Sequence, residues 1–471
     1  MTVYPAVPAL LKNEPNAKDA SFNVIERYRN PLVRENNAKI EIMRYNEKKI
    51  FIIQVLISFS TSLLLLTSIP NAHCLSKNQI IDLTLQCKKC HNSIYHQWEK
   101  SMHAGSAQDR WVISMYNGSD IPGISLGPSY KANFPESPGN CSACHAPDYA
   151  LEKPLETDLN EVQDSLGVSC LFCHFVERVD LYRDGSHPGT LSQHLKNLSQ
   201  IKENITGCLI PRSSLVSKSL ICASCHFGKY YDTLVYPSYG EWEKSNTKKN
   251  CQGCHFEKRT HRLKIDEKFF SKAIDLQMNA RIENHSLYID MAISNTGAGH
   301  FFPTGHPIRN MLFTIKASEP NGKTLSLTEG ARIPLYGGKK TNTHDENNYS
   351  GLPGKGFARV LEKVSPISCF NVSVPTPNAL LGQSLALEKE TRELFPQEYW
   401  KRTLVFEDSR IPPLGAFKET YKFEIKEGIK KIIIEARLIY RKAFKPLADV
   451  YNWDLDDLII KKLSQEITIK E

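Results

Sequence analysis

Apolar and polar residues alternate along several segments in the second half of the chain. In LYIDMAISN (Leu287–Asn295) every second residue is apolar. A period of two is typical of a strand that buries one face, and glycine and proline turns bound these segments. We therefore expect an antiparallel, β-sandwich-like domain over residues 269–471. The other segments of this kind are MLFTI (Met311–Ile315), YKFEI (Tyr421–Ile425) and KIIIEARLIYR (Lys431–Arg441).

A looser region, Gly337–Tyr399, lies between these strands, and ALEKETRELF within it predicts a helix. Residues 75–268 predict short helices between long loops. The expected fold class is therefore α+β and multidomain, with a mainly helical, loop-rich domain followed by the β-rich domain.

The longest apolar run, IFIIQVLISFSTSLLLLTSI (Ile50–Ile69), follows two lysines. A basic flank before an apolar stretch is typical of a secretory signal, and about 20 residues are also enough for an uncleaved membrane anchor. Scattered serine, threonine and glutamine favour the signal peptide. Either alternative for residues 43–74 exports the rest of the chain to the periplasm or the cell exterior. Residues 1–42 are then either a gene-model extension ahead of a true start at Met43 or a short cytoplasmic tail before an anchor.

Ten of the thirteen cysteines occur in five copies of one pentapeptide, C-x-x-C-H. Cysteines in an exported chain normally indicate disulfides, but this spacing is that of a c-type haem attachment site. The two thiols add to the haem vinyl groups as thioethers, and the adjacent imidazole binds the iron. Two intervening residues allow one helical turn to present all three groups to the same haem. The copies are Cys87–Cys90–His91, Cys141–Cys144–His145, Cys170–Cys173–His174, Cys222–Cys225–His226 and Cys251–Cys254–His255.

Other uses of paired cysteines fit this pattern less well. Zinc sites contain C-x-x-C but do not need a histidine directly after each pair, and a redox dithiol is not repeated five times in one chain. The chain has 15 histidines among 471 residues, so five chance coincidences are improbable. We therefore predict five covalently attached haem c groups and interpret residues 75–268 as a pentahaem cytochrome c domain.

The formal net charge of +8 would by itself suggest an anionic partner such as nucleic acid. Every haem adds two propionates, and the excess of lysine and arginine offsets them. We therefore expect no nucleic-acid partner.

The histidine that follows the first motif, His103, cannot share an iron with His91 on one helix. Twelve residues of helix separate them by about 18 Å. Two axial ligands of one iron lie only about 4 Å apart, since each Fe–N bond is about 2 Å long. We therefore expect that His103 binds the iron of a neighbouring haem or else binds no haem iron.

Ten histidines lie outside the motifs, and five haems have five sixth coordination positions to fill. We favour His103, His187, His261 and His300 as distal ligands, and histidine abundance favours bis-histidine over methionine ligation. The glycines of GAGHFFPTG permit His300 to approach a haem closely, although an ordinary glycine-rich turn is the competing interpretation. The candidates for a fifth distal ligand are His194, His96, His306, His285 and His344, of which His96 and His285 are more typical of surface positions.

Two repeated features organise the haem region. Motif starts at 87, 141, 170, 222 and 251 are separated by 54, 29, 52 and 29 residues, which suggests close haem pairs joined by longer segments. YHQWEKS (Tyr95–Ser101) is echoed by YGEWEKS (Tyr239–Ser245). Trp98 and Trp242 in these echoes are expected to pack on porphyrin, or simply in an ordinary core.

Several of these blocks resemble multihaem cytochromes of the cytochrome c-554 and hydroxylamine oxidoreductase-like group. They are CKKCHNSIYHQWEKSMHA, GVSCLFCHFVERV, LICASCH and YGEWEKS running into NCQGCHFEKRTHR, followed by NTGAGHFFPTGHPIRN. The resemblance covers roughly Leu85 to Arg309, with weaker echoes to Arg441. It implies that His103 and His261 are distal ligands, and only a loose match supports His187. The sequence departs from the group in QGCHFEKRTH, where relatives often have a methionine-proline pair.

These features favour an exported pentahaem electron carrier whose partners are other redox proteins, with membrane association through residues 50–69 in the anchored alternative. The alternative is a multihaem oxidoreductase that acts on a small nitrogen or sulfur species at one haem with an open site. Five haems are fewer than the eight typical of such relatives, so we expect a carrier and name no catalytic residue. A third interpretation is an oligomer-forming subunit of an extracellular cytochrome filament. The sequence leaves open whether Cys208 and Cys369 form a disulfide.

Overall fold

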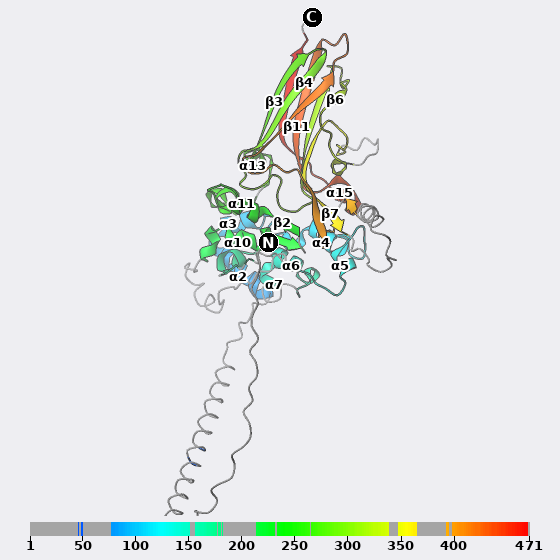
Figure 1. Ribbon diagram of the computed structural model, residues 1–471. Helices are drawn as coiled ribbons and strands as arrows, with labels where there is room; N and C mark the ends of the chain where they lie inside the picture. Colours follow the sequence, from blue (N-terminus) through cyan, green and yellow to red (C-terminus); the bar gives the residue numbers. More distant parts are fainter. Residues whose placement is uncertain are drawn as a thin grey trace, which may run out of the picture. The chain divides into compact units, whose positions relative to one another are not determined.

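The computed structural model describes residues 77–150, 156–176, 178–179, 213–230, 233–263, 265–338, 347–364, 392–394 and 398–469, with Asn46, Lys49 and Leu181 as single residues. Residues Cys74–Glu471 form one compact unit. Within this unit the chain is α+β, because short helices come first and long antiparallel strands follow (Figure 1).

Local side-chain caps set the limits of several short helices. Asp109 Oδ1 accepts a hydrogen bond from the N–H of Trp111 (2.9 Å) at the start of α4, and Gly118 ends that helix with φ 95°. Helices of four to seven residues are not stable alone in water, so their packing partners must hold them. The helices are α2 (Lys77–Cys90), α3 (Asn92–Trp98), α4 (Arg110–Asn117), α5 (Tyr130–Asn133), α6 (Cys141–His145), α7 (Pro147–Ala150), α8 (Cys170–Phe175), α10 (Leu220–His226), α11 (Ser238–Glu243), α12 (Cys251–His255), α13 (Glu267–Ser271) and α15 (Lys445–Tyr451).

The strands form two large antiparallel sheets and a small hairpin. One sheet has the order β3-β4-β10-β6, and the other has the order β12-β11-β5-β7-β8 with β9 also paired to β7. The hairpin is β1 (Gly228–Tyr230) with β2 (Thr233–Tyr236). The long strands are β3 (Ile274–Glu283), β4 (Ser286–Asn295), β5 (Asn310–Ser318), β7 (Gly354–Val364), β10 (Ala416–Glu424), β11 (Lys431–Arg441) and β12 (Leu458–Thr468), and the shorter ones are β6 (Leu327–Glu329), β8 (Arg392–Leu394) and β9 (Thr403–Asp408).

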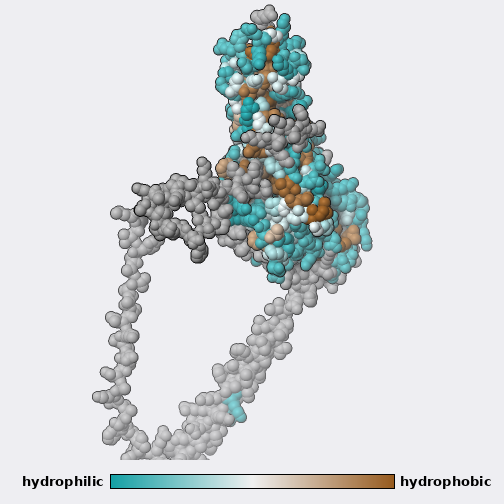
Figure 2. All heavy atoms as spheres, turned by 90° about the vertical axis from the view of Figure 1, so that its right-hand side faces the viewer, coloured by the Kyte–Doolittle hydropathy of each residue, from teal (hydrophilic) through white to brown (hydrophobic). Residues whose placement is uncertain are grey.

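The alternating pattern of the sequence corresponds to the buried faces of these sheets. In β4 the residues alternate strictly between buried and half-buried, and Leu287 and Ile289 pair with Phe423 and Tyr421 of β10. These side chains share one apolar core with β5 and β11 of the other sheet, where Phe313 is buried. Outward positions are mainly polar, as Figure 2 shows for one side of the strands. The predicted strands at Leu287–Asn295, Met311–Ile315, Tyr421–Ile425 and Lys431–Arg441 are confirmed.

The region Gly337–Tyr399 was expected to be loose with a helix at ALEKETRELF, and this prediction is wrong where the structure describes it. Arg392–Leu394 is strand β8, which pairs with the end of β7, and β7 itself runs for 11 residues from Gly354. Glu and Leu favour a helix, but helix propensity is a small energy per residue, so pairing with a sheet overrides it.

Contacts across one shared core join the helical part to the strands. Trp111 of α4 stacks on Trp453 with 4.6 Å between ring centroids, and Trp453 Nε1 donates to Ser114 Oγ (3.2 Å). Tyr451 of α15 donates a hydrogen bond to the carbonyl of Pro128. These contacts fix the strands against the segment that carries the first haem motifs.

Among the residues that the structure describes, none of the helices combines the length and the apolar character needed to cross a bilayer. The segment Ile50–Ile69, interpreted from the sequence as signal or anchor, lies outside the described residues.

Candidate haem-binding site

All five C-x-x-C-H motifs lie on short helices around one cavity. Cys87–Cys90 forms the last turn of α2, and the other four motifs form α6, α8, α10 and α12, in whole or in part. The cavity has a volume of about 1870 Å³, and all ten motif cysteines and all five motif histidines line it. Sites for a single ligand are typically about 300–1,000 Å³, so the space is enough for several large groups.

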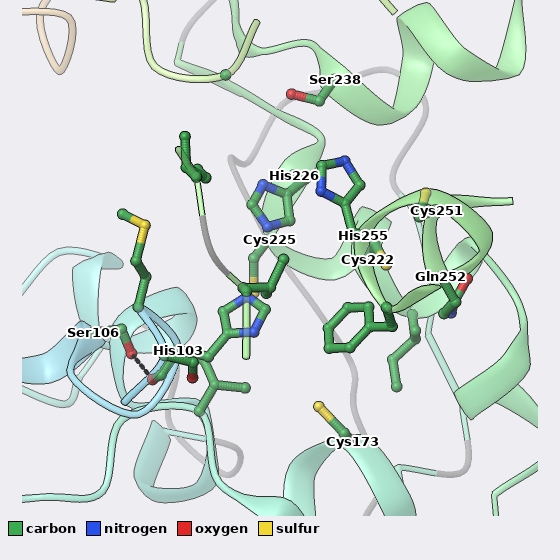
Figure 3. A pocket seen from close by; sticks show the side chains of 18 of the residues that line it. His103, Ser106, Cys173, Cys222, Cys225, His226, Ser238, Cys251, Gln252 and His255 are labelled. Atoms are coloured by element: carbon green, nitrogen blue, oxygen red, sulfur yellow. Dashed lines mark hydrogen bonds between the residues drawn. The ribbon is translucent and has the colours of Figure 1, made fainter. Parts of the chain in front are cut away.

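The structure brings three motif histidines close to histidines from distant parts of the chain. The ring centroids of His174 and His261 are 6.3 Å apart, with an interplanar angle of 13°. Those of His255 and His300 are also 6.3 Å apart, at 18°. His226 and His103 are 6.4 Å apart at 50°, and Figure 3 shows their rings facing each other across the cavity.

This separation is the one that a shared iron requires. A five-membered ring with bonds of about 1.33 Å has its nitrogen about 1.1 Å from the centroid. Two Fe–N bonds of about 2.0 Å in line, with zinc–nitrogen bonds as the guide, then place the centroids about 6.3 Å apart. The centroid separations of the three pairs therefore match that geometry.

Hydrogen bonds set the tautomer of several of these imidazoles. His261 Nδ1 lies 3.1 Å from the carbonyl of Arg259, and His300 Nδ1 lies 2.8 Å from that of Phe301. His145 Nδ1 lies 3.1 Å from the carbonyl of Ser106. A carbonyl can only accept, so Nδ1 must carry the proton in each case. The Nε2 lone pair is then free to bind a metal.

Burial keeps the imidazoles neutral. It lowers the pKa of His103 and His255 to about 4 and that of His226 to about 3, and neighbouring histidines, with Arg309 at His226, add to the effect at His255 and His226. A histidine must be neutral to bind iron. The three side chains therefore need not lose a proton at neutral pH before they bind.

Backbone and side-chain contacts hold the loops of the paired histidines. The carbonyl of His103 accepts hydrogen bonds from Ser106 Oγ and from the N–H of Val168, both at 2.9 Å (Figure 3). The fully buried Asn295, at the end of β4, donates from Nδ2 to the carbonyl of His300 (2.9 Å) and accepts from the N–H of Ala298 (3.1 Å). A residue at the end of β4 thus positions one of the candidate ligands.

His306, one of several candidates for the fifth distal position, lines the same cavity as His145. Burial lowers its pKa to about 3, and positive charge on Arg309 and His145 adds to this. Its ring lies against Tyr399, with 4.6 Å between centroids, and Nε2 has no hydrogen-bond partner among the described residues. The N–H of Ile308 points to its Nδ1 at 3.4 Å. The second histidine of GHFFPTGH was the only signal for this position in the sequence.

The remaining candidates do not lie on the cavity where the structure describes them. His96 is exposed and its Nδ1 is 2.5 Å from Glu99 Oε1, and His285 is exposed at the turn between β3 and β4. Both positions agree with the surface interpretation. His91 is exposed between α2 and α3 and borders the cavity. Several predicted residues lie outside the described residues. They are the distal-ligand candidate His187, the fifth-position candidates His194 and His344, and the two cysteines of the open disulfide question, Cys208 and Cys369.

The motifs that lie next to each other in the structure are not always those that the spacing in the sequence suggests. The neighbouring thiol of Cys251 raises the pKa of Cys222, so these two motifs lie side by side, which agrees with one of the close pairs expected from the sequence. However, the neighbouring thiol of Cys225 likewise raises the pKa of Cys144, and α2 packs against α8. Motifs that are distant in the sequence therefore meet inside the cavity.

A buried carboxylate lies behind the third motif. Asp148 is 4% exposed and its Oδ2 accepts a hydrogen bond from the N–H of Ser169 (3.1 Å), directly before Cys170. Burial raises the pKa of Asp148 to about 6 despite this bond. Sequence reasoning missed this group, because nothing in HAPDYA shows that the aspartate is buried.

Within the described parts of the chain, no group of three or more Cys, His, Asp and Glu side chains is arranged to hold a metal ion directly. The residues present instead form a set of paired thiols with imidazoles on two sides of a large space. This donor set fits covalently attached haem, which brings its own four nitrogen ligands.

Comparisons with known proteins agree with this donor set. Residues 86–175 match the family model for cytochrome c554 and c-prime. The crystal structure of a penta-haem cytochrome c552 from Thermochromatium tepidum aligns with a TM-score of 0.55 at 17% identity, covering 84% of this chain and 100% of that chain. The collagen-binding domain of a Staphylococcus aureus adhesin aligns at 8% identity over 41% of this chain and 97% of its own, but its TM-score of 0.12 carries no argument. No curated protein matches the chain.

The family match and the shared fold support a multihaem c-type cytochrome, which is the class that the sequence predicted. The family match covers the first three haem motifs, and the structural match extends over most of the compact unit.

Proposed function

We propose that the protein is an exported electron-transfer cytochrome that holds five haem c groups through its ten motif cysteines and five motif histidines. The observation that carries the proposal is the set of three imidazole pairs at 6.3–6.4 Å inside one cavity that all ten thiols line. In this proposal the distal ligands are His261 for the haem of His174, His103 for that of His226 and His300 for that of His255.

Haem supplies one-electron chemistry through the Fe(III)/Fe(II) couple. The chain determines the path of electron transfer, because each motif helix sets the position of one haem edge and each distal loop sets the tilt of that haem. Two neutral imidazoles on one iron leave no open position for a substrate. A haem with this ligation passes electrons without chemistry on a bound molecule.

The proposal extends to the parts of the chain that carry no haem motif. We propose that residues 75–268 are the haem domain and that residues 269–471 are a β-sandwich whose turn after β4 supplies His300. Export would rest on residues 43–74, and the partners would be other redox proteins that meet a haem edge at the surface. His187, for which no contact is described, remains our candidate distal ligand for a further haem.

A second candidate function is catalysis on a small nitrogen or sulfur species at the haem of His145. One observation favours it: the N–H of Ile308 points to Nδ1 of His306, which leaves the proton of that imidazole on Nε2. A protonated Nε2 donates a hydrogen bond and cannot bind iron. Tyr236 and Tyr399 lie against the same ring, with centroids 5.8 and 4.6 Å away. An open sixth position facing these donors would hold a small anion.

One experiment separates the two functions. The holoprotein is produced in a host that matures c-type cytochromes, and its mass and pyridine haemochrome spectrum give the haem count. Electron paramagnetic resonance of the oxidised protein then counts low-spin and high-spin haems, and carbon monoxide is added to the reduced protein. We expect five haems, all low-spin and inert to carbon monoxide.

Two other outcomes overturn this. One high-spin haem that binds carbon monoxide, nitrite or hydroxylamine, and that is altered by His306→Ala, would establish the second function. A colourless protein with the mass of the polypeptide alone would exclude both.

A further inference from the structure

Two copies of one seven-residue segment occupy corresponding positions beside two different haem motifs. YHQWEKS (Tyr95–Ser101) begins within α3, and YGEWEKS (Tyr239–Ser245) begins within α11. In each copy the tyrosine and tryptophan rings lie tilted against each other, with centroids 5.3 Å apart in the first and 5.5 Å in the second. The proposed function uses no side chain of either segment.

The tryptophan of each copy binds the backbone just before a haem motif. Trp98 Nε1 donates to the carbonyl of Val168 (2.9 Å), and Val168 lies two residues before Cys170. Trp242 Nε1 donates to the carbonyl of Lys249 (2.8 Å), which lies two residues before Cys251. The two indoles therefore hold the proximal segments of the third and fifth motifs at the same point.

The third residue of each copy binds the loop of a distal histidine. Gln97 Oε1 accepts hydrogen bonds from the N–H of His261 (2.9 Å) and from Thr260 Oγ1 (3.1 Å). Glu241 Oε2 accepts from the N–H of Phe301 (3.2 Å), next to His300, and from Thr304 Oγ1 (2.7 Å). In both copies one carbonyl-type oxygen takes a backbone N–H and a threonine hydroxyl.

The proximal and distal contacts of each copy belong to the same histidine pair. The first copy contacts the segments of His174 and His261, and the second contacts those of His255 and His300. We propose that each segment is a clamp that fixes the distance and tilt between the proximal and distal ligands of one haem. Gln97 and Trp98 are positioning residues for the haem of His174, and Glu241 and Trp242 are positioning residues for the haem of His255.

The two clamps differ in charge, and this difference assigns them different electrostatic effects. Gln97 is neutral, whereas Glu241 is a carboxylate only 8% exposed that faces Arg410, with 2.8 Å between Glu241 Oε1 and Arg410 Nη2. Arg410 reaches the second clamp from the strand domain and forms two 2.7 Å hydrogen bonds with Asp408. A buried negative charge stabilises the ferric state, and a buried positive charge opposes it. The second clamp thus couples the potential of one haem to the strand domain.

A close backbone approach supports the second clamp. A Cβ on Gly299 would lie 2.6 Å from Thr247 Cγ2 and 3.2 Å from Trp242 Cδ1. Only glycine fits where the loop of His300 crosses the clamp. The clamp and the loop are therefore in direct contact on both sides of the ligand.

The inference rests on the proposed haem ligation, so the test begins with variants that have been shown to carry five haems. Trp98→Phe and Trp242→Phe remove one indole N–H each and keep an aromatic ring against the tyrosine. Trp453→Phe is the matched control, because Trp453 Nε1 donates to Ser114 Oγ (3.2 Å) away from both clamps. The readouts are the low-spin g-values of each haem by electron paramagnetic resonance and its midpoint potential in a spectroelectrochemical titration.

We expect Trp98→Phe to alter the signal of one haem and Trp242→Phe to alter that of another, while the control leaves all signals unchanged. His261→Ala and His300→Ala identify which signal belongs to which haem. Changes in the same haem, in all haems or in none would overturn the clamp proposal while leaving the haem count intact. A protein without haem would instead refute the proposed function.

Exchanging the third residues tests the charge difference. Gln97→Leu removes the acceptor and should convert the haem of His174 partly to high spin, whereas Gln97→Glu keeps the acceptor and should restore low spin at a lower potential. Glu241→Gln should raise the midpoint potential of the haem of His255, because it removes one of the two negative charges that face Arg410. Unchanged potentials in both exchanges, or equal loss of low-spin signal in Gln97→Leu and Gln97→Glu, would show that the contacts have only a structural role.

Discussion

The buried ion pair between the haem region and the strands offers a direct test of how the two parts hold each other. Arg410 is 7% exposed and faces two carboxylates, those of Glu241 and Asp408. Removing one partner of a buried ion pair typically costs about 3–5 kcal/mol, because the other charge is left buried and unpaired. Asp408 is 29% exposed and still has Arg359 at 3.7 Å, so water and that guanidinium screen it. Most of the cost therefore falls on Glu241, which is 8% exposed.

We therefore expect Arg410→Met to lower the free energy of unfolding by about 3 kcal/mol, near the lower end of that range. Guanidinium unfolding of the holoprotein, followed by far-UV circular dichroism, measures the change. The matched control is Lys431→Met, which removes an ion pair with Glu466 of equal length (2.8 Å) in which both side chains are 52% exposed. Exposed pairs contribute about 0–1 kcal/mol, so this variant should be close to the wild type.

The double variant Arg410→Met/Glu241→Gln completes the cycle. Because glutamine carries no charge, it should recover about 1–2 kcal/mol of the loss if the unpaired carboxylate is its cause. The reasoning is refuted if Arg410→Met lowers the free energy of unfolding no more than Lys431→Met does. It is also refuted if Glu241→Gln lowers it by its full single-variant amount in the double variant.

Three further predictions concern single groups. His261→Ala should leave the iron next to His174 without its sixth ligand, so that one haem becomes high-spin and binds carbon monoxide, while His96→Ala at the surface changes neither absorption nor resonance spectra. Asp148→Asn should raise the unfolding free energy at pH 7 by about 2–3 kcal/mol, since the pKa of this group is raised from 3.8 to about 6. The wild type loses stability as pH rises from about 4 to about 6, because the buried Asp148 then loses its proton. In denaturant titrations the variant should therefore have no higher unfolding free energy than the wild type below about pH 4. A difference that does not depend on pH would contradict the assignment. Gly299→Ala should lower the free energy of unfolding by about 1–3 kcal/mol through overpacking, and it should shift the resonance signal of the haem at His255 alone. An unchanged signal would mean that the loop accommodates the methyl group elsewhere.

Local patterns in the sequence account for the parts of the fold that were predicted correctly. The strands at β4 and β11 follow from alternation, because a half-buried strand needs an apolar residue at every second position. The haem motifs follow from a five-residue spacing that one helical turn imposes. In both cases the physical requirement extends over a few neighbouring residues, so the sequence shows it directly.

The pairing of ligands depends on contacts that no short stretch of sequence contains. His103, His261 and His300 were singled out, but spacing could not show that they face His226, His174 and His255. The position of His306 against two tyrosines, and the proximity of Cys144 to Cys225, depend on the same long-range packing. The strand at Arg392–Leu394 was mistaken for a helix because its partner, β7, is distant in the sequence.

The repeated tryptophan segments show how such long-range geometry can still leave a trace in the sequence. Trp98 and Trp242 were expected to pack on porphyrin or in a core, but their indole nitrogens donate to backbone carbonyls before two motifs. A short helix such as α8 or α12 cannot hold its position alone, and a ligand on the far side of a haem comes from a loop that has the same weakness. A segment whose side chains bind both loops restricts the motion of each loop. The same seven-residue segment occurs twice because each copy holds the same two kinds of loop. Gln97 and Glu241 occupy the same position in the two copies and differ in charge.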